Sequence, residues 1–277
     1  MNSDFGSWPE NFPEVMCFIE GDYFSLIPLR ILQNHPDYDA AKHHENREAA
    51  LRLVHHFVNT PDNSLKFDLL KKNYSDSIIV SVHAIESDGK NRIPEMLAEY
   101  INKYTSLEVN DTIVQTNKVF RTGTDEWHRF AFRPTFEGTV KPEKKYILVD
   151  DIFSQGGSFN ELRLFIEKQG GNVVKTIAMT AGKSGPEIAL NPNTLKNLLD
   201  KYGSDSLSLF CKEINLYEGN YKAFTEPEAR SIRRAASLDQ ARNRIFAARQ
   251  KGRARMGSES YPFTAQKTLN KPHTTHL

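Results

Sequence analysis

The most informative stretch of the chain is Tyr146-Ile147-Leu148-Val149-Asp150-Asp151-Ile152-Phe153-Ser154-Gln155-Gly156-Gly157-Ser158-Phe159. It starts with a short apolar run, typical of a central parallel strand that is covered on both faces. Gly156 and Gly157 then permit backbone conformations and a close ligand approach that a Cβ would forbid. Ser158 is placed to cap a helix whose apolar residues recur at positions 162, 165 and 166. The stretch therefore predicts a buried strand ending in two carboxylates, a tight loop and a helix.

The predicted loop and the two carboxylates before it favour different ligand groups. Free N–H groups at a helix N-terminus attract phosphate. Asp150 and Asp151 would repel phosphate, but they suit hydroxyl groups or a metal ion. A sugar phosphate with free vicinal hydroxyls satisfies both requirements at once.

The surrounding segments alternate between strand and helix patterns. Apolar, β-rich residues at 77–84 precede a helical pattern at 93–104, and a further strand is expected at 112–115. After the strand at 146–150 and the helix at 158–169, Gly170-Gly171 stops the helix and 173–180 is again a strand pattern. This order predicts an α/β fold with a mostly parallel central sheet flanked by helices.

The two ends of the chain extend this core. Residues 1–35 are predicted to be irregular or short-stranded, and 37–59 helical up to a break at Pro61-Asp62-Asn63-Ser64. Beyond 182 we expect a helix at 195–199, a last strand at 207–210 and one or two Arg/Ala-rich helices at 225–255. The expected organisation is an N-terminal cap (1–70), a core (71–182), a C-terminal extension with basic helices (183–255) and a mobile tail (256–277).

Composition limits the class of protein. The 277 residues carry a net charge of +1, so the chain as a whole has no electrostatic pull on nucleic acid. Two cysteines without metal-type spacing fit a reducing cytoplasm. Neither a signal peptide nor a membrane span is expected, since no stretch approaches 18 uninterrupted apolar residues.

Taken together, Asp150-Asp151-x-x-Ser154-x-Gly156-Gly157-Ser158 after an apolar strand resembles the phosphoribosyl pyrophosphate (PRPP) loop of type I phosphoribosyltransferases. The resemblance implies that Asp150 and Asp151 hold the ribose hydroxyls and meet Mg²⁺. It also implies that Ser154, Gln155, Gly156, Gly157 and Ser158 hold the 5′-phosphate. Phospho-acceptor receivers and phosphatases also use acidic residues at strand ends, but they lack the immediate Gly-Gly-Ser helix start.

A second loop, 83–92, leaves the strand at 77–84 and enters the next helix. Family members bind pyrophosphate at this point, which implies contacts from Ala84, Ile85, Lys90 and Arg92, with Glu86 and Asp88 near a magnesium ion. Its end, Asn91-Arg92-Ile93-Pro94-Glu95-Met96-Leu97-Ala98, is most similar to the competence-associated (ComF-type) branch.

Residues 115–137 lie where the family has its flexible catalytic loop. Substitution at the anomeric carbon releases pyrophosphate, so leaving-group charge must be neutralised and water kept out. Lys118, Arg121 and Arg129 are the expected catalytic cations, in a loop or β-ribbon that closes over the pocket.

The expected function is transfer of a 5-phosphoribosyl group from PRPP to an unidentified nitrogen nucleophile. The alternative is a catalytically silent PRPP- or nucleotide-binding component of a regulatory or defence system. The nine cations within 225–256 are interpreted first as a solvated helix face, then as a surface that docks on a protein partner or on the acidic residues 1–24 of the same or another subunit, and last as a nucleic-acid contact. His43-His44 and His55-His56 are interpreted as surface or partly buried residues, not metal ligands.

Overall fold

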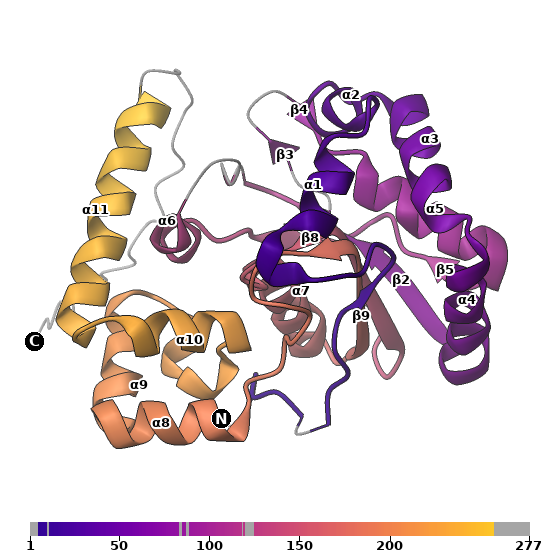
Figure 1. Ribbon diagram of the computed structural model, residues 1–277. Helices are drawn as coiled ribbons and strands as arrows, with labels where there is room; N and C mark the ends of the chain where they lie inside the picture. Colours follow the sequence, from indigo (N-terminus) through magenta and orange to yellow (C-terminus); the bar gives the residue numbers. More distant parts are fainter. Residues whose placement is uncertain are drawn as a thin grey trace, which may run out of the picture.

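The computed structural model describes residues 5–9, 11–82, 85–86, 89–117, 119 and 125–257, except for the side chains at 85, 86, 89 and 253–257. Its centre is a five-stranded sheet in which every neighbouring pair is parallel (Figure 1). The strand order is β1 (Met16–Cys17), β9 (Asn172–Ala181), β8 (Lys145–Phe153), β2 (Ser77–Ser81) and β5 (Glu108–Val109). The predicted α/β fold with a parallel central sheet is confirmed.

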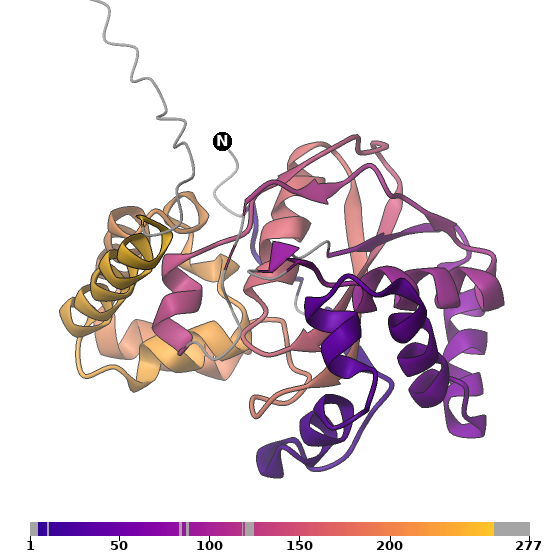
Figure 2. The ribbon, with the colours of Figure 1, turned by 90° about the horizontal axis from the view of Figure 1, so that it is seen from above.

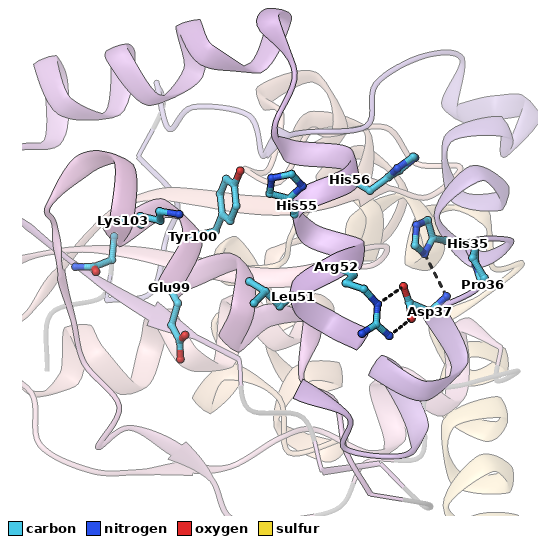
Figure 3. Close-up of a pocket in the computed structure, with 11 residues that line it drawn as sticks. His35, Pro36, Asp37, Leu51, Arg52, His55, His56, Glu99, Tyr100 and Lys103 are labelled. Atoms are coloured by element: carbon cyan, nitrogen blue, oxygen red, sulfur yellow. Dashed lines mark hydrogen bonds and ion pairs between the residues drawn. The ribbon is translucent and has the colours of Figure 1, made fainter. Parts of the chain in front are cut away.

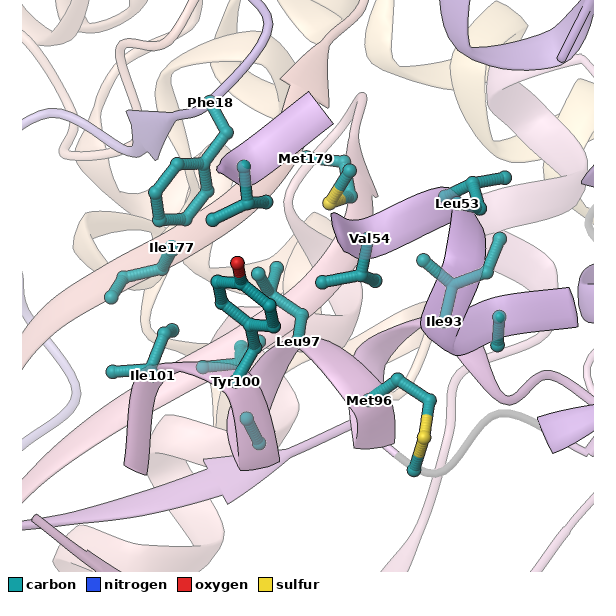
Figure 4. Close-up of a cluster of buried hydrophobic side chains, with 14 of the residues drawn as sticks. Phe18, Leu53, Val54, Ile93, Met96, Leu97, Tyr100, Ile101, Ile177 and Met179 are labelled. Atoms are coloured by element: carbon teal, nitrogen blue, oxygen red, sulfur yellow. The ribbon is translucent and has the colours of Figure 1, made fainter. Parts of the chain in front are cut away.

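Helices cover both faces of the sheet. Successive residues of a strand point to opposite faces, and in the central strands the residues on both faces are apolar. Ile79 belongs to the cluster under α3 (Arg47–Val58), α4 (Pro61–Tyr74) and α5 (Ile93–Thr105), whereas Ile78 and Val80 belong to the cluster under α7 (Gly157–Lys168). Figure 4 shows the first cluster, where side chains of α3 and α5 meet those of β9. Each fully buried aliphatic side chain contributes about 1.5–3 kcal/mol to folding.

The direction of the chain connections reverses between β2 and β8. From β2 the chain passes through α5 to β5 on one side, and from β8 it passes through α7 to β9 on the other. Parallel sheets bind ligands where the direction of connection reverses, at the carboxyl ends of the two strands concerned. The acidic pair lies near the carboxyl end of β8, which pairs with β2 on one side and with β9 on the other.

The C-terminal extension is helical and has its own apolar cluster, which includes Leu198, Phe210 and Phe224. Its helices are α8 (Pro192–Tyr202), α9 (Ser204–Glu213), α10 (Glu226–Arg234) and α11 (Leu238–Gly257). The short helix α6 (Glu126–Ala131) packs along α11 and adds Trp127 and Phe130 to the cluster (Figures 1 and 2). A segment from the middle of the sequence therefore joins the C-terminal helices.

The strand predicted at 207–210 is wrong, because these residues belong to α9. Leu207, Phe210 and Cys211 are buried on one side of that helix, at the spacing of helix neighbours. A four-residue apolar pattern fits a strand or a helix, and here the helical cluster determines the outcome.

The helix predicted at 37–59 is two helices, α2 (Tyr38–His43) and α3. Glu45 has a positive φ of 53°, and the Asn46 side chain accepts a hydrogen bond from the N–H of Ala49, so a new helix begins there. The helix ends before Pro61, as predicted, but residues 61–64 themselves begin a new helix. Pro61 is the first residue of α4, after a Thr60 side chain that caps it.

The remaining elements are short. The predicted irregular N-terminal region contains η1 (Tyr23–Ser25) and α1 (Ile27–Gln33), and two turns, η2 (Tyr217–Gly219) and η3 (Tyr221–Ala223), precede α10. The strand expected at 112–115 is β6 (Val114–Gln115), which pairs with β7 (Phe136–Glu137) outside the main sheet; β5 takes the sheet edge instead. β3 (Ile85–Glu86) and β4 (Gly89–Lys90) form a small hairpin. No helix in the described part of the chain is long and apolar enough to cross a membrane.

Candidate functional site

The two carboxylates lie within β8, not at its end as predicted, since the strand continues to Phe153 opposite Ala181 of β9. Both are buried, with 8% of Asp150 and 4% of Asp151 exposed. In the regular part of β8 the side chains alternate, so that Val149 belongs to the cluster under the N-terminal helices and Leu148 to the cluster under α7. Asp150 and Asp151 depart from this alternation, because their carboxyl groups lie close enough to interact with each other.

Asp151 has a partner that the sequence analysis missed. The ammonium of Lys42, a buried residue of α2, lies 2.6 Å from Oδ2 of Asp151. The two residues are 109 positions apart, and a lysine near the end of a short helix is normally interpreted as solvent-exposed. No local pattern could have identified this contact.

The surroundings give the two carboxyl groups opposite electrostatic properties. Burial, followed by the neighbouring charge of Asp151, raises the pKa of Asp150 well above its usual range. Burial also acts to raise the pKa of Asp151, but the Lys42 ammonium outweighs it, and the pKa is lowered. The Asn91 amide, which lies near the carboxylate, lowers it further. The two adjacent carboxyl groups therefore differ in the direction of their pKa shifts, raised for Asp150 and lowered for Asp151.

The loop after β8 leads into α7 through Gly156, whose φ is +80°. Gly156 is the residue that precedes the first turn, and no side chain caps the helix, so the prediction that Ser158 is the cap is wrong. In the described part of the chain, no acceptor binds the backbone N–H groups of residues 154–159. These groups at the start of a 12-residue helix form a region of positive potential.

Both glycines of the loop are required by packing. A Cβ on Gly156 would lie 2.9 Å from atoms of Phe153 and Thr225, and one on Gly157 would overlap the guanidinium of Arg133. The loop is also anchored from α10, because the hydroxyl of Thr225 donates to the carbonyl of Gln155 at 2.6 Å. The C-terminal extension thus fixes the conformation of the loop.

Gln155 provides an unexpected feature of the same loop. Its side chain is 6% exposed, yet neither its amide nitrogen nor its amide oxygen has a hydrogen-bond partner among the described residues. Buried polar groups are nearly always hydrogen-bonded, so an orphaned amide indicates a place for a ligand or an ordered water. The resemblance implied a phosphate contact from Gln155, and nothing in the sequence indicated that its side chain is buried without a partner among the described residues.

Arg129 brings an uncompensated positive charge to the loop. Its guanidinium donates to the hydroxyl of Ser154, its Nε is buried without a partner, and no carboxylate in the described ranges lies within ion-pair distance. Burial lowers the pKa of Arg129, with Asp125 and Glu126 acting in the opposite direction. Arg129 was expected in a loop or β-ribbon that closes over the pocket, whereas it lies in the short helix α6.

Arg133, four positions further on, is fully paired. It forms ion pairs with Glu161 at 2.9 Å and Glu228 at 2.6 Å, and it donates to the hydroxyl of Tyr217. Burial acts to lower its pKa, but the charges of Glu228 and Glu161 outweigh burial and raise it. Arg133 therefore stabilises the junction of α7 and α10, whereas Arg129 is left to meet an anion.

The predicted pyrophosphate residues are less open than expected. Lys90 and Arg92 form ion pairs with Glu95 at 3.0 and 2.8 Å, and Arg92 also pairs with Glu45. The backbone of Ile85 lies in β3, and Ala84, Lys118 and Arg121 lie outside the described residues. Among the described residues of this loop, Asn91 interacts with the carboxylate of Asp151.

A hollow of about 1040 Å³ lies elsewhere, against α3 and α5 (Figure 3). It is lined by His35, His55, His56, Tyr100 and the Arg52–Asp37 ion pair, among others, and by no residue of the β8–α7 loop. His55 and His56 are therefore surface residues of this hollow. No group of three or more His, Cys, Asp or Glu side chains suited to a metal occurs in the part of the chain that the structure describes.

The acidic pair does not fit a metal ion as it stands. Mg²⁺ requires several oxygen ligands in a near-octahedral arrangement. Here Lys42 holds Oδ2 of Asp151 directly, and Oδ1 of Asp151 accepts a hydrogen bond from the N–H of Ile152 at 2.9 Å. A cation at this position would also be repelled by the ammonium.

No family model matches the chain. It is 40% identical over 251 residues to protein TraN of Escherichia coli, an alignment that covers 89% of this chain and 54% of TraN. It is 36% identical over 163 residues to an uncharacterized protein of Haemophilus influenzae, covering 58% of this chain and 34% of that protein. The chain thus spans about half of TraN and about a third of the Haemophilus protein.

Among solved structures, a purine phosphoribosyltransferase from Pyrococcus horikoshii is 16% identical, with a TM-score of 0.31, over 43% of this chain and 72% of that one. An adenine phosphoribosyltransferase from Leishmania donovani is 11% identical, with a TM-score of 0.33, over 54% of this chain and 63% of that one. Likenesses at this level do not bear on function, which must be argued from the site.

Proposed function

We propose that the chain binds PRPP at the carboxyl ends of β2 and β8, with the 5′-phosphate at the N-terminus of α7. The observation that carries this proposal is the convergence of three features on one loop: free N–H groups, the orphaned amide of Gln155 and the uncompensated guanidinium of Arg129. Each offers hydrogen-bond donors, and two of them carry positive potential, as a phosphate dianion requires.

The acidic pair supplies the second half of the recognition. Carboxylate oxygens of Asp150 and Asp151 accept hydrogen bonds from the vicinal ribose hydroxyls in this proposal. The two aspartates lie on the strand that leads directly into the loop of residues 154–158. In this proposal one ribose ring spans the distance, with its 5′-phosphate at the loop and its two hydroxyls at the aspartates. Any Mg²⁺ enters as part of the substrate, bound to its pyrophosphate, since the pair is already engaged with Lys42.

The proposed reaction is transfer of the 5-phosphoribosyl group to a nitrogen nucleophile. The bond from the anomeric carbon to pyrophosphate breaks, a bond to nitrogen forms, and the nitrogen loses a proton. Pyrophosphate leaves with the bonding electrons, so cations must face it. Lys118 and Arg121 are proposed for that task, and Arg129 balances the 5′-phosphate.

A second candidate is a binder that holds the same ligand without turnover. It is favoured by the ion pairs that engage Lys90 and Arg92 with glutamates of the same chain, because these cations are then unavailable to a leaving pyrophosphate. Regulators of this kind need the phosphate loop and the acidic pair alone.

Isothermal titration with PRPP, followed by a pyrophosphate-release assay, tests both candidates. The transferase predicts binding together with pyrophosphate release in the presence of a suitable nitrogenous base, and the binder predicts binding alone. Absence of PRPP binding by the folded protein would contradict both.

A further inference from the structure

Lys42 is the one cation whose ammonium contacts the acidic pair within the described ranges of the chain. It reaches Asp151 from α2, and α2 is itself tied to the loop after β2, where the N–H of Arg92 donates to the carbonyl of Ala41 at 3.1 Å. The helix that carries the ammonium is therefore held by the residue that precedes α5.

The contact is buried on both sides, with 10% of the Lys42 side chain and 6% of the Asp151 side chain exposed. A carboxylate in such surroundings requires a positive partner, because water is not available to solvate it. In many sites that bind phosphorylated sugars a divalent cation could meet this requirement. Here a side chain of the protein meets it.

We propose that Lys42 is the resident cation of this site: it occupies the position at Asp151 that a divalent metal would otherwise take, so that the protein itself holds no metal and binds ribose hydroxyls without one. The inference rests on the proposed function for the identity of the ligand only. Lys42 acts through Asp151 and is a positioning residue.

An ion pair with a purely structural role would have different consequences. Removing its lysine would destabilise the chain, and added metal would not matter. If Lys42 takes the place of a metal, removing its charge leaves a buried carboxylate beside a second carboxyl group, and a divalent cation can then enter.

The metal arm of the test uses Mn²⁺ as the probe, the full chain and no sugar phosphate. Electron paramagnetic resonance measures bound Mn²⁺ in the wild type, in Lys42→Met and in the double variant Lys42→Met/Asp151→Asn. We expect Lys42→Met to bind Mn²⁺ at least about tenfold more tightly than the wild type, and the double variant to lose the gain. Mn²⁺ should also raise the melting temperature of Lys42→Met alone.

Two results would overturn the proposal: a folded Lys42→Met that gains no Mn²⁺ site, or a wild type that binds Mn²⁺ in a manner abolished by Asp151→Asn. If Lys42→Met does not fold, Lys42→Gln replaces it, and the wild-type result still decides. Lys42→Arg, which keeps the charge, is the control and should gain no site.

The ligand arm uses ribose 5-phosphate, which has no pyrophosphate to carry a metal. Its affinity for the wild type should be the same in EDTA and in Mg²⁺, and a requirement for Mg²⁺ would overturn the proposal. If ribose 5-phosphate does not bind at all while the Mn²⁺ results are as expected, the proposed function fails and the role of Lys42 stands.

Discussion

At the scale of single residues, two arginines four positions apart have different roles. Arg133 is surrounded by Glu161, Glu228 and Tyr217, whereas Arg129 contacts the phosphate loop without a carboxylate partner in the described part of the chain. Sequence analysis could name Arg129 as one cation among several. It could not separate the two, because their partners come from distant segments.

Replacing Arg129 by Gln should weaken PRPP binding by about 1.5–3 kcal/mol, since a charged hydrogen bond to phosphate is lost. Arg242→Gln is the matched control, because Arg242 pairs with Glu213 and Asp239 away from the loop. Isothermal titration measures both variants. Equal affinity of the folded Arg129 variant and the wild type would remove Arg129 from the phosphate site.

The pKa shift of Asp150 predicts a dependence of stability on pH. The pKa of Asp150 is raised in the folded protein, whereas in unfolded chains an aspartate has a pKa of about 3.9. The protonated Asp150 therefore contributes its full stability below about pH 3.9. This stability is lost as the pH rises through the folded-state pKa. Asp150→Asn removes this loss. The variant should therefore gain stability relative to the wild type as the pH increases above 4, measured by urea unfolding at a series of pH values. A difference that is constant with pH would show that Asp150 ionises normally.

At the scale of elements, the strand–loop–helix unit of residues 145–168 was largely predictable. A continuous apolar run, two glycines and helical spacing give the same result whatever surrounds them. The extent of β8 could not be predicted, because pairing with β9 carries the strand past the carboxylates. The absence of a Ser158 cap could not be predicted either, because the loop is held by Thr225 from a distant segment. The strand predicted at 207–210 failed because a four-residue apolar run fits a strand or a helix. The helix break before Pro61 was predicted, but the start of α4 at Pro61 was not.

The fit of the loop against α10 predicts a stability difference between two glycines. Gly157→Ala should cost about 1–3 kcal/mol, since the new Cβ would overlap Arg133. Gly182→Ala is the control, because its Cβ would lie 3.6 Å or more from its neighbours, an ordinary contact. Denaturant unfolding measures both variants. Equal stabilities would mean that the loop and α10 are not tightly packed.

At the scale of the whole molecule, the basic C-terminal region packs on α6 and α9, and not on the acidic N-terminal segment. Arg249 donates to the carbonyl of Ile214, Arg242 pairs with Glu213, and Arg244 lies over the ring of Trp127. No described ion pair joins α10 or α11 to residues 5–9 or 11–24. The basic helices therefore dock on other helices of the same chain. The distribution of charge along the sequence could not identify these partners.

This arrangement predicts little affinity for nucleic acid. Each phosphate contact on duplex DNA adds about 0.9 to the slope of log affinity against log salt. Cations engaged within the chain cannot make such contacts, so binding near physiological salt should be absent, as measured by fluorescence anisotropy with DNA and RNA oligonucleotides. A steep salt-dependent affinity that falls in an Arg244→Ala variant would contradict this, because Arg244 is exposed on α11.

The most direct test of the account is a crystal structure of the chain grown with PRPP. We predict the 5′-phosphate within hydrogen-bond distance of the N–H groups of residues 154–158 and of the Arg129 guanidinium, with both ribose hydroxyls facing Asp150 and Asp151. Ligand density at another place, or a phosphate loop that remains empty at saturating PRPP, would contradict the central claim.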